Sequence, residues 1–149
     1  MRAVVQRVSS ASVTISTQKV AEIDTGLLVL VGIKADDNEK DMDYIAKKIV
    51  GLRIFEDEAG KMNLSVHDVK GSLLIVPNFT LYGDATKGMR PSFILSGSVD
   101  EAKQKYDLFL KKLETYDIIL QTGQFQADMK VALTNDGPVT ILLDSSKLF

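Results

Sequence analysis

The sequence of 149 residues has no cysteine, no tryptophan, only three prolines and a single histidine. Without cysteine the chain has no disulfide framework, no thiolate nucleophile and no cysteine metal site, which favours the reducing cytoplasm as its location. The sole histidine, His67, lies between Val66 and Asp68 in a region of irregular pattern, and no Gly-x-Ser-x-Gly motif occurs. A serine triad is therefore not expected.

Long apolar runs and ligand-binding motifs are also missing. No segment approaches the roughly 18 apolar residues that cross a bilayer, and the N-terminal apolar run is broken by Gln6 and Arg7. We therefore expect neither a secretion signal nor a membrane partner. Acidic pairs such as Asp36 and Asp37 have the pattern of caps and turns, and no glycine-rich nucleotide motif occurs, so no metal and no cofactor is predicted.

The balance of charge argues against a broad basic surface. The formal net charge is -2 and the pI is about 5.4, unlike proteins that bind nucleic acid through one wide basic face. A local contact with nucleic acid stays open, because Lys61, Lys87, Arg90 and Lys130 lie in or beside predicted loops. These cations either gather near one site or are scattered, solvated charges.

What is present is the pattern of a single α+β domain, predicted to span residues 1–149. Hydrophobic residues make up 45% of the chain, enough for a core. Apolar residues at spacings of three and four predict one helix that follows caps at residues 36–38 and reaches Leu52, and a second helix over residues 98–116. Strands are predicted at residues 3–8, 12–15, 20–23, 27–33, 53–56, 72–76, 118–121, 129–133 and 139–143, with 135–138 joining the last two. The short turns favour antiparallel pairing, and we expect mostly antiparallel strands that curl into a barrel-like sheet.

Two segments place backbone-shaping residues beside strand-like runs. Gly137-Pro138 combines a residue without Cβ with one without N–H, which leaves carbonyl oxygens that can be aimed into a cavity. The alternative is that this step only turns a hairpin. Phe79 and Thr80 end a buried strand, where main-chain N–H groups can form an oxyanion hole. Thr80 itself is either a nucleophile without a visible base or an ordinary strand threonine.

Phe125 and Met129 are further candidates near these segments. Both precede the strand that leads to Gly137, although their composition also fits a place in the core.

A series of short motifs runs along nearly the whole chain. In order, they are Met1–Val8, Ala11–Thr14, Gly26–Gly32, Lys48-Ile49, Leu52–Asp57, Lys61–Asn63, Phe79–Tyr82, Lys87-Gly88, Arg90–Phe93, Ala127–Met129 and Asn135–Thr140. With so many motifs in order and at matching spacing, the chain resembles the D-aminoacyl-tRNA deacylases, also called D-tyrosyl-tRNA(Tyr) deacylases.

The resemblance implies a homodimeric enzyme whose partner is the acceptor end of aminoacyl-tRNA. In that family the Gly-Pro step, here Gly137 and Pro138, is cis and enters the site of the partner subunit, where its carbonyls hold the α-ammonium of the substrate. A D-residue then directs its side chain outward, an L-residue would drive its Cβ into the backbone, and glycine passes the same filter. The implied role is chirality proofreading in translation.

The implied reaction is hydrolysis of the ester that joins a D-amino acid, or glycine mischarged on tRNA(Ala), to the terminal adenosine. The 2′-hydroxyl of that ribose assists, and main-chain N–H groups near Phe79 and Thr80 stabilise the oxyanion. Such RNA-assisted catalysis explains the missing triad, and we expect a structural or hydrogen-bonding role for Thr80. The predicted site consists of catalytic Phe79 and Thr80 and substrate-binding Asn78, Phe125, Met129, Gly137 and Pro138.

Two positions depart from the family pattern. Pro77-Asn78 stands where Ser-Gln is usual, and Gln126 stands where glycine is usual. A related animal group with relaxed chiral selection also has proline at the first place, whereas Phe79 and the intact Asn135–Thr140 motif match the D-selective class. Two alternatives therefore stay open: a relaxed deacylase that accepts some L-substrates, and a noncatalytic protein that binds the tRNA end.

Overall fold

The structure is a computed structural model that describes residues 1–149. The predicted α+β fold, with two main helices and mostly antiparallel strands in a nearly closed, barrel-like sheet, is confirmed. The elements in chain order are β1 Arg2–Ile15, β2 Gln18–Ile23, β3 Gly26–Gly32, α1 Glu39–Gly51, β4 Phe55–Glu56, β5 Met62–Leu64, β6 Ser72–Pro77, the 3-10 helix η1 Phe79–Tyr82, α2 Val99–Glu114, β7 Ile119–Thr122 and β8 Met129–Asp144.

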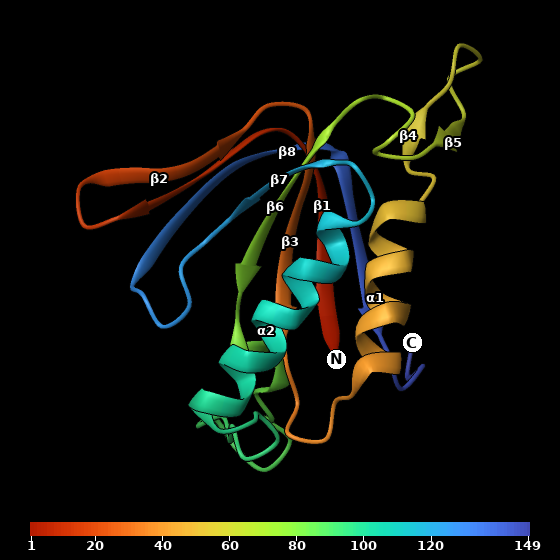
Figure 1. Ribbon diagram of the computed structural model, residues 1–149. Helices are drawn as coiled ribbons and strands as arrows, with labels where there is room; N and C mark the ends of the chain where they lie inside the picture. Colours follow the sequence, from red (N-terminus) through yellow and green to blue (C-terminus); the bar gives the residue numbers. More distant parts are fainter.

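One sheet organises the molecule, with the strand order β2-β1-β3-β6-β7 and with β8 also paired to β1. β1 is antiparallel to β2, β3 and β8, whereas β6 runs parallel to β3 and β7. Each parallel pair is joined by a connection that contains a helix, as parallel pairing requires a crossover. Figure 1 shows α1 and α2 on one face of the sheet, while β2 and the adjoining ends of β1 and β8 extend past the helices as an arm.

Two apolar clusters fill the fold, one between the helices and the sheet and one between the sheet and the arm. Side chains alternate between the faces of a strand, so β6 contributes to both clusters. Leu73 and Ile75 belong to the cluster on the helix side, and Leu74 and Val76 to the cluster on the arm side. The carboxyl end of β6 therefore lies between two packed layers.

The two longest strands, β1 and β8, are each predicted as two separate strands, and the structure corrects both predictions. β1 runs through residues 9–11 without ending, and pairs first with β3 and then with β2. β8 runs through residues 135–138, which the sequence predicts to be a connection, and pairs with β1 on both sides of them. Long-range ladder pairing here overrides the local turn propensity of Asn, Asp, Gly and Pro.

The two helices begin close to the predicted caps. Asn38 is the N-cap of α1: its side chain accepts from a first-turn N–H, and its own N–H donates to Asp41 Oδ2 at 2.9 Å. At α2, Ser98 and Glu101 have capping-box spacing, but the Ser98 hydroxyl donates to the Glu101 carboxylate at 2.6 Å and caps no backbone N–H. Both helices bury their predicted apolar faces, except that Val99 at the start of α2 is exposed.

Three shorter segments also differ from the predictions. β4 covers only Phe55–Glu56 of the strand expected at 53–56, and β5 lies within a stretch predicted to be irregular. Phe79 and Thr80, predicted to end a strand, lie in η1 after β6 has ended at Pro77.

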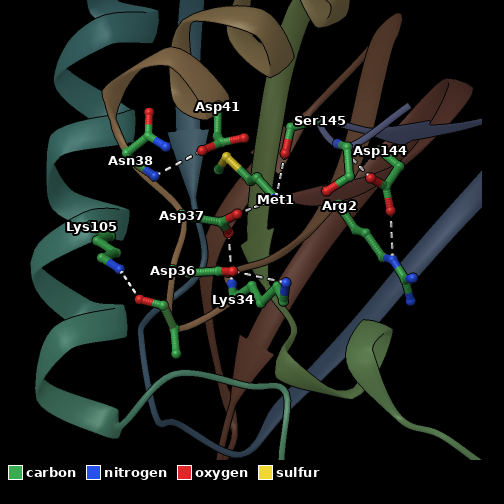
Figure 2. Close-up of polar contacts among 12 residues, drawn as sticks. Met1, Arg2, Lys34, Asp36, Asp37, Asn38, Asp41, Lys105, Asp144 and Ser145 are labelled. Carbon is green, nitrogen blue, oxygen red and sulfur yellow. Dashed lines mark hydrogen bonds and ion pairs between the residues drawn. The ribbon is translucent and has the colours of Figure 1, made fainter. Parts of the chain in front are cut away.

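The first residues of β1 are held between α1 and the end of β8, as Figure 2 shows. The buried Met1 α-ammonium pairs with the Asp37 carboxylate and donates to Ser145 Oγ at 2.6 Å. The neighbouring Arg2 pairs with Asp144 through Nε and Oδ2, which are 2.8 Å apart. These contacts join residues that are distant in sequence, so they fix the position of β1 relative to the end of β8.

Candidate functional site

β6 ends at the rim of the sheet, and η1 follows it there. The Asn78 N–H donates to the Val31 carbonyl of β3 at 2.8 Å, which keeps the chain on the sheet for one residue past Pro77. Gly32 makes space for the turn that follows, because a Cβ there would lie 2.9 Å from Leu81 Cβ and 3.2 Å from Asn78 O. A larger residue at position 32 would push η1 away from the sheet.

The side chain of Asn78 caps η1 and decides which of its amides are free. Asn78 Oδ1 accepts from the Thr80 N–H at 3.2 Å and from Thr80 Oγ1 at 2.5 Å. The Phe79 N–H has no hydrogen-bond partner, and the Phe79 side chain is 59% exposed. The Phe79 N–H is therefore open to a ligand, whereas the Thr80 hydroxyl donates to an amide and has no basic side chain bonded to it.

Arg2 connects η1 to the anchored start of β1. Its Nη1 donates to the Leu81 carbonyl at 3.1 Å, and its guanidinium carbon lies 4.7 Å from the centroid of the Tyr82 ring. Burial raises the pKa of the Tyr82 phenol far above its usual value, so Tyr82 stays neutral under Arg2. Because the Asp144 pair holds the other side of the guanidinium, Arg2 fixes η1 from outside the cavities described next.

Two cavities lie on opposite sides of the end of β6. The α2-side cavity, of about 370 Å³, is bounded by Phe125 and by Ser96 and Gly97 at the entry to α2. The arm-side cavity, of about 400 Å³, is bounded by Leu30 and Met129. The residues common to both are Pro77, Asn78, Phe79 and Gln126. A ligand bound at Phe79 can therefore extend to both sides of the same backbone segment.

The Gly137-Pro138 step lies in a bulge of β8. Gln6 faces Thr140 and Val8 faces Asn135 in the β1–β8 ladder, so residues 136–139 of β8 stand opposite residue 7 of β1 alone. The peptide bond before Pro138 is cis, and the φ angle of Gly137 is +117°, a value that favours glycine. Both residues are exposed. The hairpin alternative is therefore wrong, and the bulge presents backbone on the surface.

Arg7 holds the base of this bulge. Its Nε donates to the Asp136 carbonyl at 3.2 Å and lies 3.1 Å from Asp136 Oδ2, while Nη1 donates to the Ile54 carbonyl at 2.6 Å. Asn135 adds a second brace, because its Nδ2 donates to the carbonyls of Arg7 at 2.9 Å and Val139 at 3.1 Å. The backbone of the bulge is thus fixed by buried or half-buried side chains.

The bulge is separated from both cavities within one chain. Leu30, at the wall of the arm-side cavity, lies on β3 opposite Val4, whereas the bulge lies on β8 opposite Arg7. The bulge is therefore displaced from Leu30 by two strand spacings across the sheet and by three residues along it. Each of these displacements corresponds to about 10 Å. Gly137 and Pro138 line neither cavity.

The sheet surface between the bulge and the arm-side cavity is partly exposed, and we call it the open face. Leu142, Val4 and Leu30 form a row across β8, β1 and β3, and Leu142 is 54% exposed. Thr140 belongs to the next row, and the bulge that holds Pro138 follows directly beyond it on β8. The open face therefore has the Gly-Pro step at one end and the arm-side cavity at the other.

The structure brings together most of the predicted site but divides it in two. Asn78, Phe79, Phe125 and Met129 surround the two cavities, and Thr80 follows in η1. Gly137 and Pro138 lie apart from them in the same chain.

The two arginines that hold these halves are not among the predicted site residues. Arg7 carries a detectable signal, because a charged residue inside a strand of buried apolar residues needs a partner. Arg2 has no such signal, since its contact with Leu81 joins residues 79 positions apart.

Other chemistry is not assembled near this site. His67 lies beside Asp68 and Lys70 in a separate polar hollow that includes Gly71, just before β6 begins, so the sole histidine is at the other end of that strand. No group of three or more His, Cys, Asp or Glu side chains is placed to hold a metal ion. Neither α1 nor α2 is long and apolar enough to cross a membrane.

Comparison with known proteins matches residues 4–144 to the family model described as D-Tyr-tRNA(Tyr) deacylase. A D-aminoacyl-tRNA deacylase of Petrotoga mobilis is 58% identical over 150 aligned residues, and one of Thermosipho africanus is 54% identical over 149. Each alignment covers the whole of both chains.

Solved structures with the same fold include one described as c-Myc DNA unwinding element binding protein. It is 42% identical, with a TM-score of 0.92 over 97% of this chain and 98% of its own. A probable eukaryotic D-amino acid tRNA deacylase is 16% identical, with a TM-score of 0.81 over 95% of this chain and 97% of its own, which shows the fold alone.

Proposed function

The chain belongs to the D-Tyr-tRNA(Tyr) deacylase family, and we propose that it removes D-amino acids from tRNA. As an aminoacyl-tRNA hydrolase it adds water to the ester carbonyl and breaks the bond to the ribose oxygen. The products are a free D-amino acid and tRNA with its terminal hydroxyl restored. The observation that carries the detailed mechanism is the unpaired Phe79 N–H between two cavities.

The Phe79 N–H is the group that stabilises the oxyanion. It is the unpaired amide at the start of η1, and Asn78 fixes the turn that aims it. A preorganised backbone donor acts where negative charge develops in the transition state, which needs no reactive side chain. The 2′-hydroxyl of the terminal ribose assists the attack, since no histidine lines either cavity. Thr80 has a structural role, because its hydroxyl donates to Asn78 Oδ1.

In the proposed complex, the ester of the substrate lies between the two cavities. With the ester carbonyl at Phe79, the amino acid enters the arm-side cavity beside Met129, which opens toward the open face. The terminal nucleoside then occupies the α2-side cavity beside Phe125, where apolar walls suit a base.

Chiral selection requires a second copy of the chain on the open face. Within its own chain, the Gly137-Pro138 step lies about 10 Å from the cavity wall along the strands and about 10 Å from it across the strands. The step therefore acts in the partner. A two-fold pairing of open faces places each step at the other chain's arm-side cavity and covers Leu142. The step's carbonyls accept from the substrate α-ammonium, and its backbone excludes the Cβ of an L-residue. Glycine lacks Cβ, so glycine mischarged on tRNA(Ala) is also a substrate.

Deacylation of D-Tyr-tRNA and L-Tyr-tRNA by the purified protein tests the reaction and its selectivity. We expect rapid release of D-Tyr and sparing of L-Tyr. Inertness toward both substrates would reject the function. Release of both would favour the second candidate, a relaxed deacylase, which is motivated by Pro77-Asn78 at the wall of both cavities. L-Ala-tRNA serves as the further test of that candidate, and tRNA binding without turnover would indicate a noncatalytic binding protein.

Complementation between two inactive variants tests the shared site. Gly137→Val damages the step, and Ala127→Trp fills the arm-side cavity, which Ala127 lines. In a mixed dimer, one site combines the intact step of one chain with the intact cavity of the other. With random mixing, about half of the dimers are mixed, and one of the two sites in each mixed dimer is intact. About a quarter of wild-type activity should therefore return. If each site is built within one chain, the mixture stays inactive.

The cytoplasmic location stays a prediction.

A further inference from the structure

Residues 83–97 form a loop that is fastened to η1 at both ends. At the start, the Gly83 N–H donates to the Thr80 carbonyl at 2.9 Å. At the end, Ser96 Oγ donates to the Phe79 carbonyl at 3.2 Å, and the Phe93 ring meets the Phe79 ring edge-on with centroids 5.2 Å apart. The loop is therefore part of the frame around the free Phe79 N–H.

A pair of backbone hydrogen bonds closes the loop into a tip. Asp84 and Ser92 exchange N–H to O bonds, each 2.8 Å long, so residues 85–91 project beyond this bridge. The tip carries Lys87 and Arg90, both exposed and without an ion pair. The only acid in the loop, Asp84, accepts from Thr86 N and Oγ1 at 2.8 and 2.6 Å.

Large apolar side chains are exposed on the same loop. Met89 is 101% exposed and Ile94 is 89% exposed, and neither packs on a core cluster. Exposed apolar groups interleaved with unpaired cations suit a single nucleic-acid strand, whose bases take the apolar contacts and whose phosphates take the charges. On a chain with net charge -2, the loop tip is positive beside the site.

The size of the cavities shows what must lie outside them. Cavities of about 370 and 400 Å³ accept an amino acid and one nucleoside, but not the strand that precedes that nucleoside. Ser96 and Gly97 close the loop and also line the α2-side cavity assigned to the nucleoside. A strand that leaves this cavity therefore passes next to residues 83–97.

We propose that loop 83–97 binds the unpaired 3′ strand of the tRNA upstream of the terminal adenosine, with Lys87 and Arg90 contacting its phosphates. This inference rests on the proposed function and adds to it a separate RNA-binding surface. Contacts to phosphate are independent of base, so the loop contributes affinity and leaves amino-acid selection to the cavities.

The experiment compares two substrates that differ only in the upstream strand: D-Tyr-tRNA and D-tyrosyl-adenosine. In Lys87→Gln/Arg90→Gln, kcat/KM for D-Tyr-tRNA should fall about tenfold at low salt, and the slope of log kcat/KM against log salt should weaken by about two. The loss on D-tyrosyl-adenosine, which has no upstream phosphate, should be at least fivefold smaller. Lys47→Gln/Lys111→Gln is the matched control, because it removes two exposed, unpaired helix cations and should change neither slope nor ratio.

Equal losses on both substrates would overturn the proposal, since the tip would then only shape the cavity. No loss on D-Tyr-tRNA at low salt would overturn it as well. The proposed function fails by a different result, namely wild-type protein that hydrolyses neither substrate.

Discussion

η1 and the bulge of β8 are both short backbone segments held by an arginine of β1, yet they differ in what surrounds them. η1 lies between two cavities and is fixed by Arg2, while the bulge stands exposed on the open face and is fixed by Arg7. One segment has a place for a ligand and a free amide. The other has exposed backbone and, in its own chain, no ligand cavity. In the proposed dimer, each chain would therefore contribute its two segments to different sites.

The largest expected effect comes from changing the exposed segment. A Cβ at Gly137 would lie 2.8 Å from Arg7 Nη2 and 2.8 Å from Val139 Cγ2, at a φ that side chains rarely adopt. Gly137→Val should therefore displace the carbonyls and lower the rate of D-Tyr-tRNA deacylation by about 100-fold. Gly51→Ala is the control, because nothing lies within 4 Å of the added Cβ and the rate should be unchanged. A fully active Gly137→Val would remove the bulge from the site.

The next effect tests whether Arg2 positions the other segment. Losing the bond to the Leu81 carbonyl should loosen η1. The lower value for a charged hydrogen bond, about 1.5 kcal/mol, predicts a roughly tenfold fall in kcat with little change in KM. Arg2→Gln leaves Asp144 buried without its partner, so Arg2→Gln/Asp144→Asn is the matched variant. The double variant should regain thermal stability but not kcat. Recovery of both would assign Arg2 a purely structural role.

A smaller effect is expected at Thr80. Thr80→Ala removes the hydroxyl bond to Asn78 Oδ1 but keeps the Thr80 N–H bond, so the cap of η1 persists. We expect less than a fivefold loss in kcat, whereas removing a nucleophile costs on the order of a thousandfold or more. Single-turnover rates on D-Tyr-tRNA, with circular dichroism to verify folding, distinguish these two results.

The smallest effect concerns the loop beside η1 and its response to pH. Hydrogen bonds from the Thr86 hydroxyl and N–H lower the pKa of Asp84 below its ordinary value of 3.8. A lowered folded-state pKa means that the turn is fully stabilised above the ordinary value and loses this support as the pH falls through the lowered one. Amide exchange in residues 84–92 should thus stay protected from pH 7 to 5, after correction for intrinsic rates. Loosening within that interval would contradict the assignment. Asp84→Asn should abolish the loss of protection that we expect once the pH falls below the ordinary pKa.

Much of the fold was predictable because its signals are local. Asn38 caps α1 as predicted, and the apolar faces of both helices follow from residue spacing. The prediction failed where local and long-range preferences disagree. Residues 135–138 have the composition of a turn, but pairing with β1 on both sides carries them within one strand.

Several residues that the sequence names for the site line the two cavities, and their roles stay predictions, whereas their arrangement was not predictable. Asn78, Phe79, Phe125 and Met129 were all expected near substrate, and they do surround the cavities. That these cavities lie on opposite sides of β6 depends on which layer each face of the strand packs against. No local pattern contains that information.

The amino-acid order alone settled the helices, most strands and the motifs that carry the family resemblance, because each depends on neighbouring residues. The folded chain alone determined that Gly137-Pro138 forms a bulge on an open face and that η1 keeps one amide free. Both results arise from contacts between distant segments, such as Arg7 with Asp136 and Arg2 with Leu81, whose geometry exists only once the sheet has closed.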